Sequence, residues 1–348
     1  MIKVLIVDDS SLIRQLMTTI LSSDKDIEVV GTAQDPYDAR EKIKSLKPDV
    51  LTLDVEMPKM DGVTFLRNLM RLHPMPVVMV STLTDAGASI TLEALELGAV
   101  DYISKPKLDF QSQMMAYSDE IISKVKAAAK ANFAGGYVAP KKVLKKIPDK
   151  DAIKFKTTDL IIAIGASTGG TEAIKDILCQ LPPDTPGIVV TQHIPGAFST
   201  AFAQRLNQNT AMSVSEAVDG QQILPGHVYL APGGKHLEVK RSGARFTCRV
   251  LDTDPVNRHK PSVEVLFKSV AASAGANSIC VLLTGMGNDG SEAMGIMKAA
   301  GAPTIAQDEQ SSVVWGMPGE AVRAGHADDV LPLHHIAEKI LHYVSKHG

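Results

Sequence analysis

The segment AIGASTGGTEA, residues 163–173, leads an apolar strand directly into a glycine-rich turn that holds one serine. Glycines in such a turn either cradle a phosphate or present a nucleophile. The phosphate interpretation is weak, because no lysine follows the glycines as in a P-loop, and Gly165, Gly169 and Gly170 lack GxGxxG spacing. What remains is G-x-S-x-G, a strand–turn–helix arrangement that lifts Ser167 above a sheet. The segment therefore predicts an α/β fold with a serine at the end of a strand.

The apolar runs around this segment predict an α/β domain in the second half of the chain. They alternate with amphipathic stretches, as strands alternate with helices in a doubly wound parallel sheet. Between residues 227 and 250 the chain reads more like short hairpin strands, with PGG and RSGAR as turn signals. We expect a mostly parallel sheet with a small antiparallel addition, built from LIIAIG (160–165), GIVVTQ (187–192), HVYLAP (227–232), SICVLLTG (278–285) and PTIAQ (303–307).

The first 105 residues show the same alternation and predict a second sheet. Continuous apolar runs fit strands that are buried on both faces. We expect a flavodoxin-like, five-stranded parallel sheet of order 2-1-3-4-5. Its strands are VLIV (4–7), IEVV (27–30), DVLTL (49–53), PVVMV (76–80) and VDYIS (100–104).

A basic segment separates the two halves. Residues 111–131 read as one long closing helix, and from Lys141 to Lys156 there are seven lysines against two aspartates. Such a run is typical of a solvated linker, although an anionic partner is the alternative. We therefore expect a first domain at 1–130, a linker at 131–157 and a second domain at 158–348.

Composition narrows the class of protein. The chain has 348 residues, of which 45% are hydrophobic and 22% charged, with a formal net charge of -3. That balance argues against a nucleic-acid binder, which usually carries a basic domain. No run approaches the ~20 apolar residues of a membrane span, and MIKVLIVDDSS does not read as a signal peptide. With three scattered cysteines, we expect a cytoplasmic protein that is not membrane-inserted.

Three acids follow strands of the first domain. Asp8 and Asp9 end the first strand and Asp54 ends the third, and these strands are neighbours in the expected sheet. Clustered carboxylates repel one another unless a hard divalent cation such as magnesium binds them. Asp54 could then attack phosphorus and form an acyl phosphate. Ser81 and Lys105, after the fourth and fifth strands, could bind the phosphoryl oxygens. The alternative is that the acids only cap helices.

The first domain resembles the response-regulator receiver domain over residues 1 to about 130, through VDDS, LDVEMPKMDG and SKP. The resemblance implies phosphoryl transfer from a histidine-kinase partner, with magnesium. The residues that it implies are Asp54 for phosphorylation, Asp8, Asp9 and Asp54 for the metal, and Ser81, Tyr102 and Lys105 for the switch.

Ser167 alone could be only a helix cap, because a serine hydroxyl is a poor nucleophile without a base. His193 follows the next strand, in TQHIPG, and Asp289 follows a later strand, in LTGMGNDG. All three residues therefore lie just past the carboxyl ends of strands, which share one edge of a parallel sheet. Two other histidines stand in motif-like stretches, APGGKHL and NRHKPS, and could line the cleft. The competing residues are His227, His236, His259 and His326 as the base, and Asp252, Asp254, Asp328 and Asp329 as the acid.

This set of residues predicts acyl transfer. Ser167 attacks a carbonyl carbon, His193 accepts its proton and later gives it to the leaving group, and Asp289 orients the imidazole. The oxyanion needs preorganised donors, which we expect from the backbone of Met286 and from Thr168. The chain order serine, histidine, aspartate differs from that of the α/β-hydrolases. We therefore expect a triad on an α/β sheet that is distinct from the α/β-hydrolase fold.

The second domain resembles the CheB chemotaxis methylesterase family through IGASTGG, QHIP, APGGKHL, HKPSVEVLF and LTGMGNDG. The resemblance implies hydrolysis of γ-glutamyl methyl esters on chemoreceptors, with release of methanol, and deamidation of receptor glutamines. No cofactor is needed for that step. A receiver in front of a hydrolase suggests a lid over Ser167 that opens when Asp54 is phosphorylated. The alternative is a non-catalytic regulator whose second domain only binds a partner. DNA-binding and nucleotide-binding output domains fit less well.

Overall fold

A computed structural model describes residues 1–82, 84–105, 114–132 and 159–347. The chain divides into two compact units, Met1–Lys141 and Lys142–Gly348. The expected linker lies outside the described residues except for 131 and 132. The expected closing helix is α5, Met114–Ala129.

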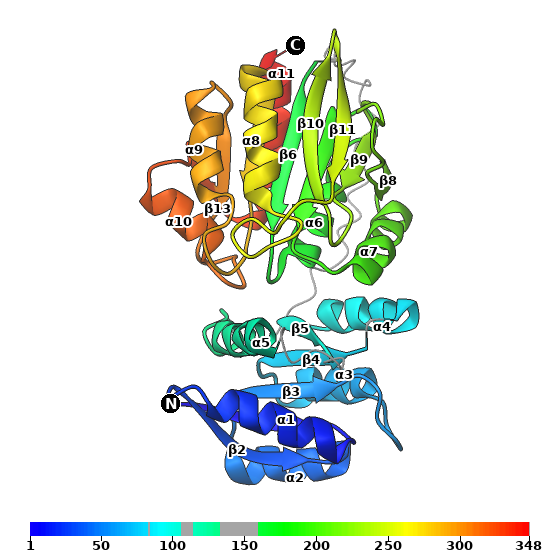
Figure 1. Cartoon of the computed structure of the whole chain (residues 1–348), viewed down its shortest axis with the longest axis vertical. Coiled ribbons are helices and arrows are strands. Elements are labelled where there is room, and N and C mark those ends of the chain that lie inside the picture. Colours follow the sequence, from blue (N-terminus) through cyan, green and yellow to red (C-terminus); the bar gives the residue numbers. More distant parts are fainter. Residues whose placement is uncertain (83, 106–113, 133–158, 348) are drawn as a thin grey trace. The chain divides into compact units, whose positions relative to one another are not determined.

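The first unit is a five-stranded parallel sheet with helices on both faces (Figure 1). Its order, β2-β1-β3-β4-β5, is the predicted one. α1 packs beside α5 on one face, and α3 packs beside α4 on the other. The central strands are buried at every residue, as their continuous apolar runs indicate. The elements before α5 are β1 (Ile2–Val7), α1 (Ser11–Ser22), β2 (Ile27–Ala33), α2 (Pro36–Leu46), β3 (Val50–Asp54), α3 (Gly62–Leu72), β4 (Val77–Ser81), α4 (Asp85–Glu96) and β5 (Asp101–Ser104).

The first four helices of this unit begin at side chains that accept hydrogen bonds from first-turn backbone N–H groups. None of these caps belongs to the cluster of three acids. The alternative that those acids only cap helices is therefore wrong for α1 to α4. The caps are Ser10, Asp35, Asp61 and Thr84.

The second unit has a seven-stranded parallel sheet of order β14-β13-β12-β6-β7-β9-β8 and a separate antiparallel pair, β10 with β11. This confirms the mostly parallel sheet with a small antiparallel addition. The strand that begins at His227 pairs in parallel with β7 and β8, so the hairpin starts only at His236. The strands are β6 (Ile161–Ala166), β7 (Gly187–Gln192), β8 (Ser213–Glu216), β9 (His227–Leu230), β10 (His236–Ser242), β11 (Arg245–Leu251), β12 (Ser278–Leu282), β13 (Thr304–Gln307) and β14 (Asp329–Leu331).

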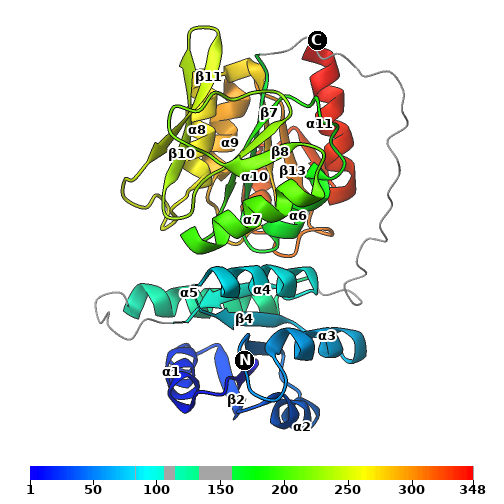
Figure 2. The same ribbon diagram turned by 90° about the vertical axis from the view of Figure 1, so that its right-hand side faces the viewer.

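Helices cover both faces of this sheet. Figure 2 shows α8 and α9 on the side of the β10–β11 hairpin, and α6, α7 and α11 on the other side. The helices are α6 (Gly170–Leu178), α7 (Gly196–Asn209), α8 (Val263–Ser273), α9 (Ser291–Ala299), α10 (Met317–Arg323) and α11 (Leu333–His347), with a short 3₁₀ turn at Gly275–Asn277.

The strand order reverses at β6, which lies between β7 and β12. Such a switch point opens a crevice at the carboxyl ends of the strands. Gly165 lets α8 approach closely there, because a Cβ on this glycine would lie 2.3 Å from Cγ1 of Val263. The first turn of α8 thus reaches the edge of the sheet at which Ser167 follows β6.

Candidate active site

Three loops at the carboxyl edge of the large sheet bring Ser167, His193 and Asp289 together. Ser167 follows β6, His193 follows β7, and Asp289 precedes α9. Oγ of Ser167 lies 3.0 Å from Nδ1 of His193, and Nε2 of the same ring lies 2.8 Å from Oδ2 of Asp289. A carboxylate only accepts hydrogen bonds, so the ring proton belongs on Nε2 and Nδ1 can accept the serine proton. The three side chains are arranged as nucleophile, base and orienting acid.

The backbone around Ser167 is fixed. Its N–H donates to the carbonyl of Thr284 at 3.0 Å, and its carbonyl accepts from Nε2 of Gln192 at 2.8 Å. Gly169 is the N-cap of α6 and has a φ of 75°, in the left-handed region that glycine adopts without strain. Ser167 therefore does not cap the helix, and its hydroxyl faces His193 instead.

Asp289 lies in a buried nest of hydrogen-bond donors. Nδ2 of Asn257 and Oγ of Ser262 each donate to Oδ1 at 2.8 Å, and the N–H of Val263 donates to Oδ2 at 2.7 Å. Burial alone would raise the pKa of this carboxyl, but hydrogen bonds from His193, Asn257 and Ser262 outweigh burial and lower the pKa to about 2. The carboxylate is therefore ionised at neutral pH and can stabilise an imidazolium.

Sequence reasoning missed Asn257 and Ser262. Their only signal was that they are the first and last residues of NRHKPS, the motif-like stretch that contains His259. That histidine does reach the triad, since its ring stacks on His193 with centroids 3.7 Å apart. His236 is linked to the triad only through Ser262. Its Nδ1 accepts a hydrogen bond from the N–H of Ser262 at 3.2 Å, and Oγ of Ser262 donates to Asp289.

Five of the other residues considered for the base or the acid have partners outside the triad. Three of the acids form ion pairs with lysines, and two of the histidines bond to backbone carbonyls. The acids are Asp252, Asp328 and Asp329, and the histidines are His227 and His326. In the part of the chain that the structure describes, the carboxylate that bonds His193 is that of Asp289.

The expected oxyanion donors lie beside the nucleophile. Gly285 packs so closely on Ser167 that a Cβ would lie 2.8 Å from the serine Cβ. Its backbone is hydrogen-bonded to the segment 314–317, which fixes the loop. The next N–H, that of Met286, donates to none of the described residues, whereas the N–H of Ser167 already has a partner. Thr168 is buried next to the nucleophile. Both residues stay predictions as oxyanion donors.

In the first unit, Asp8, Asp9 and Asp54 offer carboxylate oxygens that all lie within 4.8 Å of one another. Nζ of Lys105 lies 2.7 Å from Asp54 and 3.4 Å from Asp8. Burial raises the pKa of Asp54 to about 6, with the charge of Asp8 adding to the effect and Lys105 opposing it. Oδ2 of Asp8 is buried and makes no hydrogen bond, and its ion pair with Nζ of Lys105 is long, at 3.4 Å. An all-oxygen donor set in which one buried carboxylate oxygen lacks a hydrogen bond fits magnesium.

The predicted switch residues have different surroundings. Lys105 contacts Asp54 directly. Ser81 is buried at the end of β4, and its Oγ lies 3.4 Å from the carbonyl of Gly87 in α4. Tyr102 is buried on β5, with Nζ of Lys124 4.9 Å from its ring centroid. Their roles in switching stay predictions.

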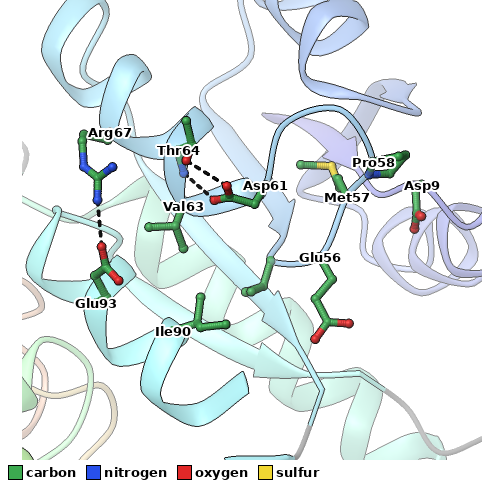
Figure 3. A pocket seen from close by; sticks show the side chains of 11 residues that line it. Asp9, Glu56, Met57, Pro58, Asp61, Val63, Thr64, Arg67, Ile90 and Glu93 are labelled. Atoms are coloured by element: carbon green, nitrogen blue, oxygen red, sulfur yellow. Dashed lines mark hydrogen bonds and ion pairs between the residues drawn. The ribbon is translucent and has the colours of Figure 1, made fainter. Parts of the chain in front are cut away.

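A hollow of about 630 Å³ borders the acid cluster on the first unit (Figure 3). The β3–α3 loop, α3 and α4 form its walls. Asp9 and Glu56 line one part, and the ion pair of Arg67 with Glu93, at 2.7 Å, lines another. Its carboxylates outnumber its single guanidinium, so the hollow disfavours anions. It belongs to the first unit, whereas the triad belongs to the second.

Comparison with known proteins assigns the second unit. Residues 162–340 match the family model for CheB methylesterase. A protein-glutamate methylesterase/protein-glutamine glutaminase of Xanthomonas oryzae pv. oryzae is 59% identical, over 98% of this chain and 96% of the relative. The chain belongs to the CheB methylesterase family.

The likeness to the CheB family extends to both units. Residues 4–115 match the response regulator receiver domain. A protein of the same name from Hydrogenovibrio crunogenus is 56% identical, over 99% of each chain. The crystal structure of the Thermotoga maritima CheB methylesterase catalytic domain is 37% identical with a TM-score of 0.52, and covers 53% of this chain and 99% of that one.

The two matches confirm the receiver-plus-hydrolase layout expected for a CheB-family chain, and they do not favour the non-catalytic alternative.

Among the described helices, none combines the length and apolar character needed to cross a bilayer.

Proposed function

We propose that this chain is a phosphorylation-regulated hydrolase that demethylates glutamate methyl esters and deamidates glutamines on chemoreceptors. Relatives at 59% and 56% identity carry the name protein-glutamate methylesterase/protein-glutamine glutaminase. The observation that most supports the proposal is the hydrogen-bond chain from Ser167 through His193 to Asp289. The ester reaction releases methanol and the amide reaction releases ammonia.

The acylation step uses all three triad residues. Oγ of Ser167 attacks the side-chain carbonyl carbon as its proton passes to Nδ1 of His193. The imidazolium that forms is stabilised by the carboxylate of Asp289 at 2.8 Å from Nε2. The backbone N–H of Met286, with Thr168 beside the nucleophile, receives the oxyanion.

The leaving group distinguishes the two reactions, but the residues are the same. His193 returns its proton to the departing methoxide or amide, and an acyl-serine remains. Water then attacks the acyl carbon while His193 takes a proton from it, and His193 gives this proton to Oγ of Ser167 as the C–O bond to the serine breaks. Both substrates end as the free glutamate. The chain's own residues suffice for this cycle, so no cofactor takes part in it.

The receiver supplies regulation. Asp54 accepts a phosphoryl group from the phosphohistidine of a chemotaxis histidine kinase, so an O–P bond forms as the N–P bond breaks. Asp8, Asp9 and Asp54 would hold magnesium, which neutralises charge on the incoming phosphoryl group. Lys105, with Nζ 2.7 Å from Asp54, then binds a phosphoryl oxygen. The proposed switch residues are Ser81, Tyr102 and Lys105.

Phosphorylation of the receiver relieves inhibition of the hydrolase in this proposal. The domain limits that go with it are 1–130 for the receiver, 131–157 for the linker and 158–348 for the hydrolase. The protein acts in the cytoplasm, where the kinase and the cytoplasmic part of a chemoreceptor meet it.

Methanol release from methylated chemoreceptor membranes tests both halves. We would compare the intact chain with Ser167→Ala and Asp54→Asn, each with and without a small phosphodonor and magnesium. Ser167→Ala should lose activity by about 10³-fold or more. Asp54→Asn should keep the basal rate and lose the stimulation. Methanol release at the parent rate by Ser167→Ala would mean that the triad is misassigned.

A further inference from the structure

A two-residue turn beside the triad holds an unusual backbone conformation. Val256 and His259 exchange both backbone hydrogen bonds, at 3.1 and 2.9 Å. Between them Asn257 and Arg258 have φ values of 52° and 66°. Positive φ at both central residues defines a type I′ turn, where Asn is well suited and Arg is strained. Such strain persists only where other contacts hold the turn in place, and it concentrates at functional sites.

Two residues of this turn, Asn257 and His259, contact the triad. Nδ2 of Asn257 donates to Oδ1 of Asp289 at 2.8 Å. The ring of His259 lies flat on the ring of His193, with centroids 3.7 Å apart and an angle of 11° between the planes. One short segment therefore reaches the orienting acid and the base together.

The stacked ring supplies a restraint that the triad hydrogen bonds lack. The bonds at Nδ1 and Nε2 fix the positions of the two nitrogens of His193. Rotation of the ring about the line through these nitrogens leaves both distances unchanged, so the two hydrogen-bond lengths do not oppose a tilt that small changes in χ1 and χ2 of the side chain permit. That rotation turns the Nδ1 lone pair, which lies in the ring plane, away from Oγ of Ser167. A second ring lying flat against the first blocks the rotation.

We propose that His259 is a positioning residue for the base, and that its ring face sets the tilt of His193. The inference rests on the proposed function of the triad. It extends that function because the 256–259 turn would raise kcat by holding the base in position. Because the contact is made between ring faces, another flat aromatic ring at residue 259 should replace the imidazole.

The test compares His259→Ala, His259→Phe and, as a matched control, His227→Ala. His227 also stacks on an aromatic ring, that of Tyr229, but it begins β9 and so lies at the amino edge of the sheet. In the full chain, we would measure kcat and KM for methanol release and the rate at which a fluorophosphonate labels Ser167. His259→Ala should lower kcat and the labelling rate about 10-fold, with KM changed less than about 2-fold. His259→Phe should stay within about 3-fold of the parent, and His227→Ala should match it.

Each other outcome overturns the proposal. An unchanged kcat in His259→Ala means that the stack is dispensable, and a His259→Phe variant as slow as His259→Ala means that the ring face is not what matters. Circular dichroism gives the folded fraction of each variant, and a loss that disappears after correction for that fraction would make His259 merely structural. Ser167→Ala distinguishes failure of the positioning role from failure of the proposed function. If Ser167→Ala is inactive while His259→Ala keeps the parent activity, the positioning role is wrong and the proposed function stands.

Discussion

Two buried carboxylates in this chain have pKa values shifted in opposite directions, and their neighbours explain why. Both are desolvated, which by itself raises a carboxyl pKa. Around Asp289, hydrogen bonds from His193, Asn257 and Ser262 reverse that effect and lower the pKa to about 2. Asp54 has a like charge beside it and only partial compensation from Lys105, so its pKa rises to about 6. Removing the two charges should therefore have opposite effects on stability.

Asp54→Asn should stabilise the first unit when magnesium is absent. The folded-state pKa of about 6 exceeds the ordinary value of 3.8, so the folded state binds more protons between these pH values. Ionising Asp54 therefore destabilises the fold, by on the order of 1–3 kcal/mol at neutral pH, and the penalty disappears as the pH falls below about 4. Calorimetry in EDTA should give a higher Tm for the variant at pH 7.5 and equal values near pH 4. A lower Tm for the variant at pH 7.5 would contradict this, and magnesium should stabilise the parent more than the variant.

Asp289→Asn should have the opposite effect on stability and a large effect on rate. The folded-state pKa of about 2 lies below 3.8, so the ionised carboxylate contributes stability at neutral pH, roughly 1–3 kcal/mol. That contribution is present above about pH 4 and is lost as the pH falls through 2. The neutral amide no longer stabilises the imidazolium, so kcat should fall about 10³- to 10⁴-fold. Rate assays and urea unfolding at pH 7 check both effects, and a variant as stable as the parent would contradict the assigned ionisation.

At the scale of elements, position relative to buried strands decided what the sequence could predict. Ser167, His193 and Asp289 were predictable because each follows an apolar run whose carboxyl end had to lie on one edge. The edge strands β8 and β14 were missed, because they have only 4 and 3 residues and their burial patterns, unlike those of the central strands, between them include only one buried residue. Asn257 and His259 lie in a turn without hydrophobic periodicity, and their partners, Asp289 after β12 and His193 after β7, are distant in the sequence.

The packing of α8 on β6 offers a test at this scale. Gly165→Ala places a Cβ 2.3 Å from Cγ1 of Val263, so the first turn of α8 must shift. The N–H of Val263 also bonds to Asp289, and activity should fall together with stability, the latter by about 1–3 kcal/mol. Adding Val263→Ala makes room for the new methyl group and should recover part of the activity.

Gly196→Ala is the matched control for this pair. Its nearest neighbour would be the carbonyl of Gly233 at 3.4 Å, an ordinary contact, and the residue begins α7. It should therefore leave both the activation free energy of the reaction and the free energy of unfolding within about 0.5 kcal/mol of the parent values. If Val263→Ala only worsens Gly165→Ala in a double-mutant cycle, the close approach of α8 is not what links this glycine to the triad.

At the scale of the whole molecule, each unit contains its own sheet and its own chemistry. The oxygens that would hold magnesium come from the two residues after β1 and from the last residue of β3, all in the first unit. The hydrogen bonds that join Ser167 to His193, and those that join Asp289 to His193, Asn257, Ser262 and Val263, all lie within residues 167–289. We therefore expect regulation to act on access to the triad rather than on its assembly.

This separation predicts the behaviour of a truncated chain that begins at residue 159. Because its triad bonds all lie within the second unit, the truncated chain should be active without phosphodonor. If the receiver inhibits by restricting access, the truncated chain should release methanol at least about 5-fold faster than the unphosphorylated intact chain, at a rate near that of the phosphorylated one. Ser167→Ala in the truncated chain gives the background. A folded truncated chain that is active but no faster than the unphosphorylated intact chain would rule out simple inhibition, and the receiver would then have to activate the hydrolase when phosphorylated.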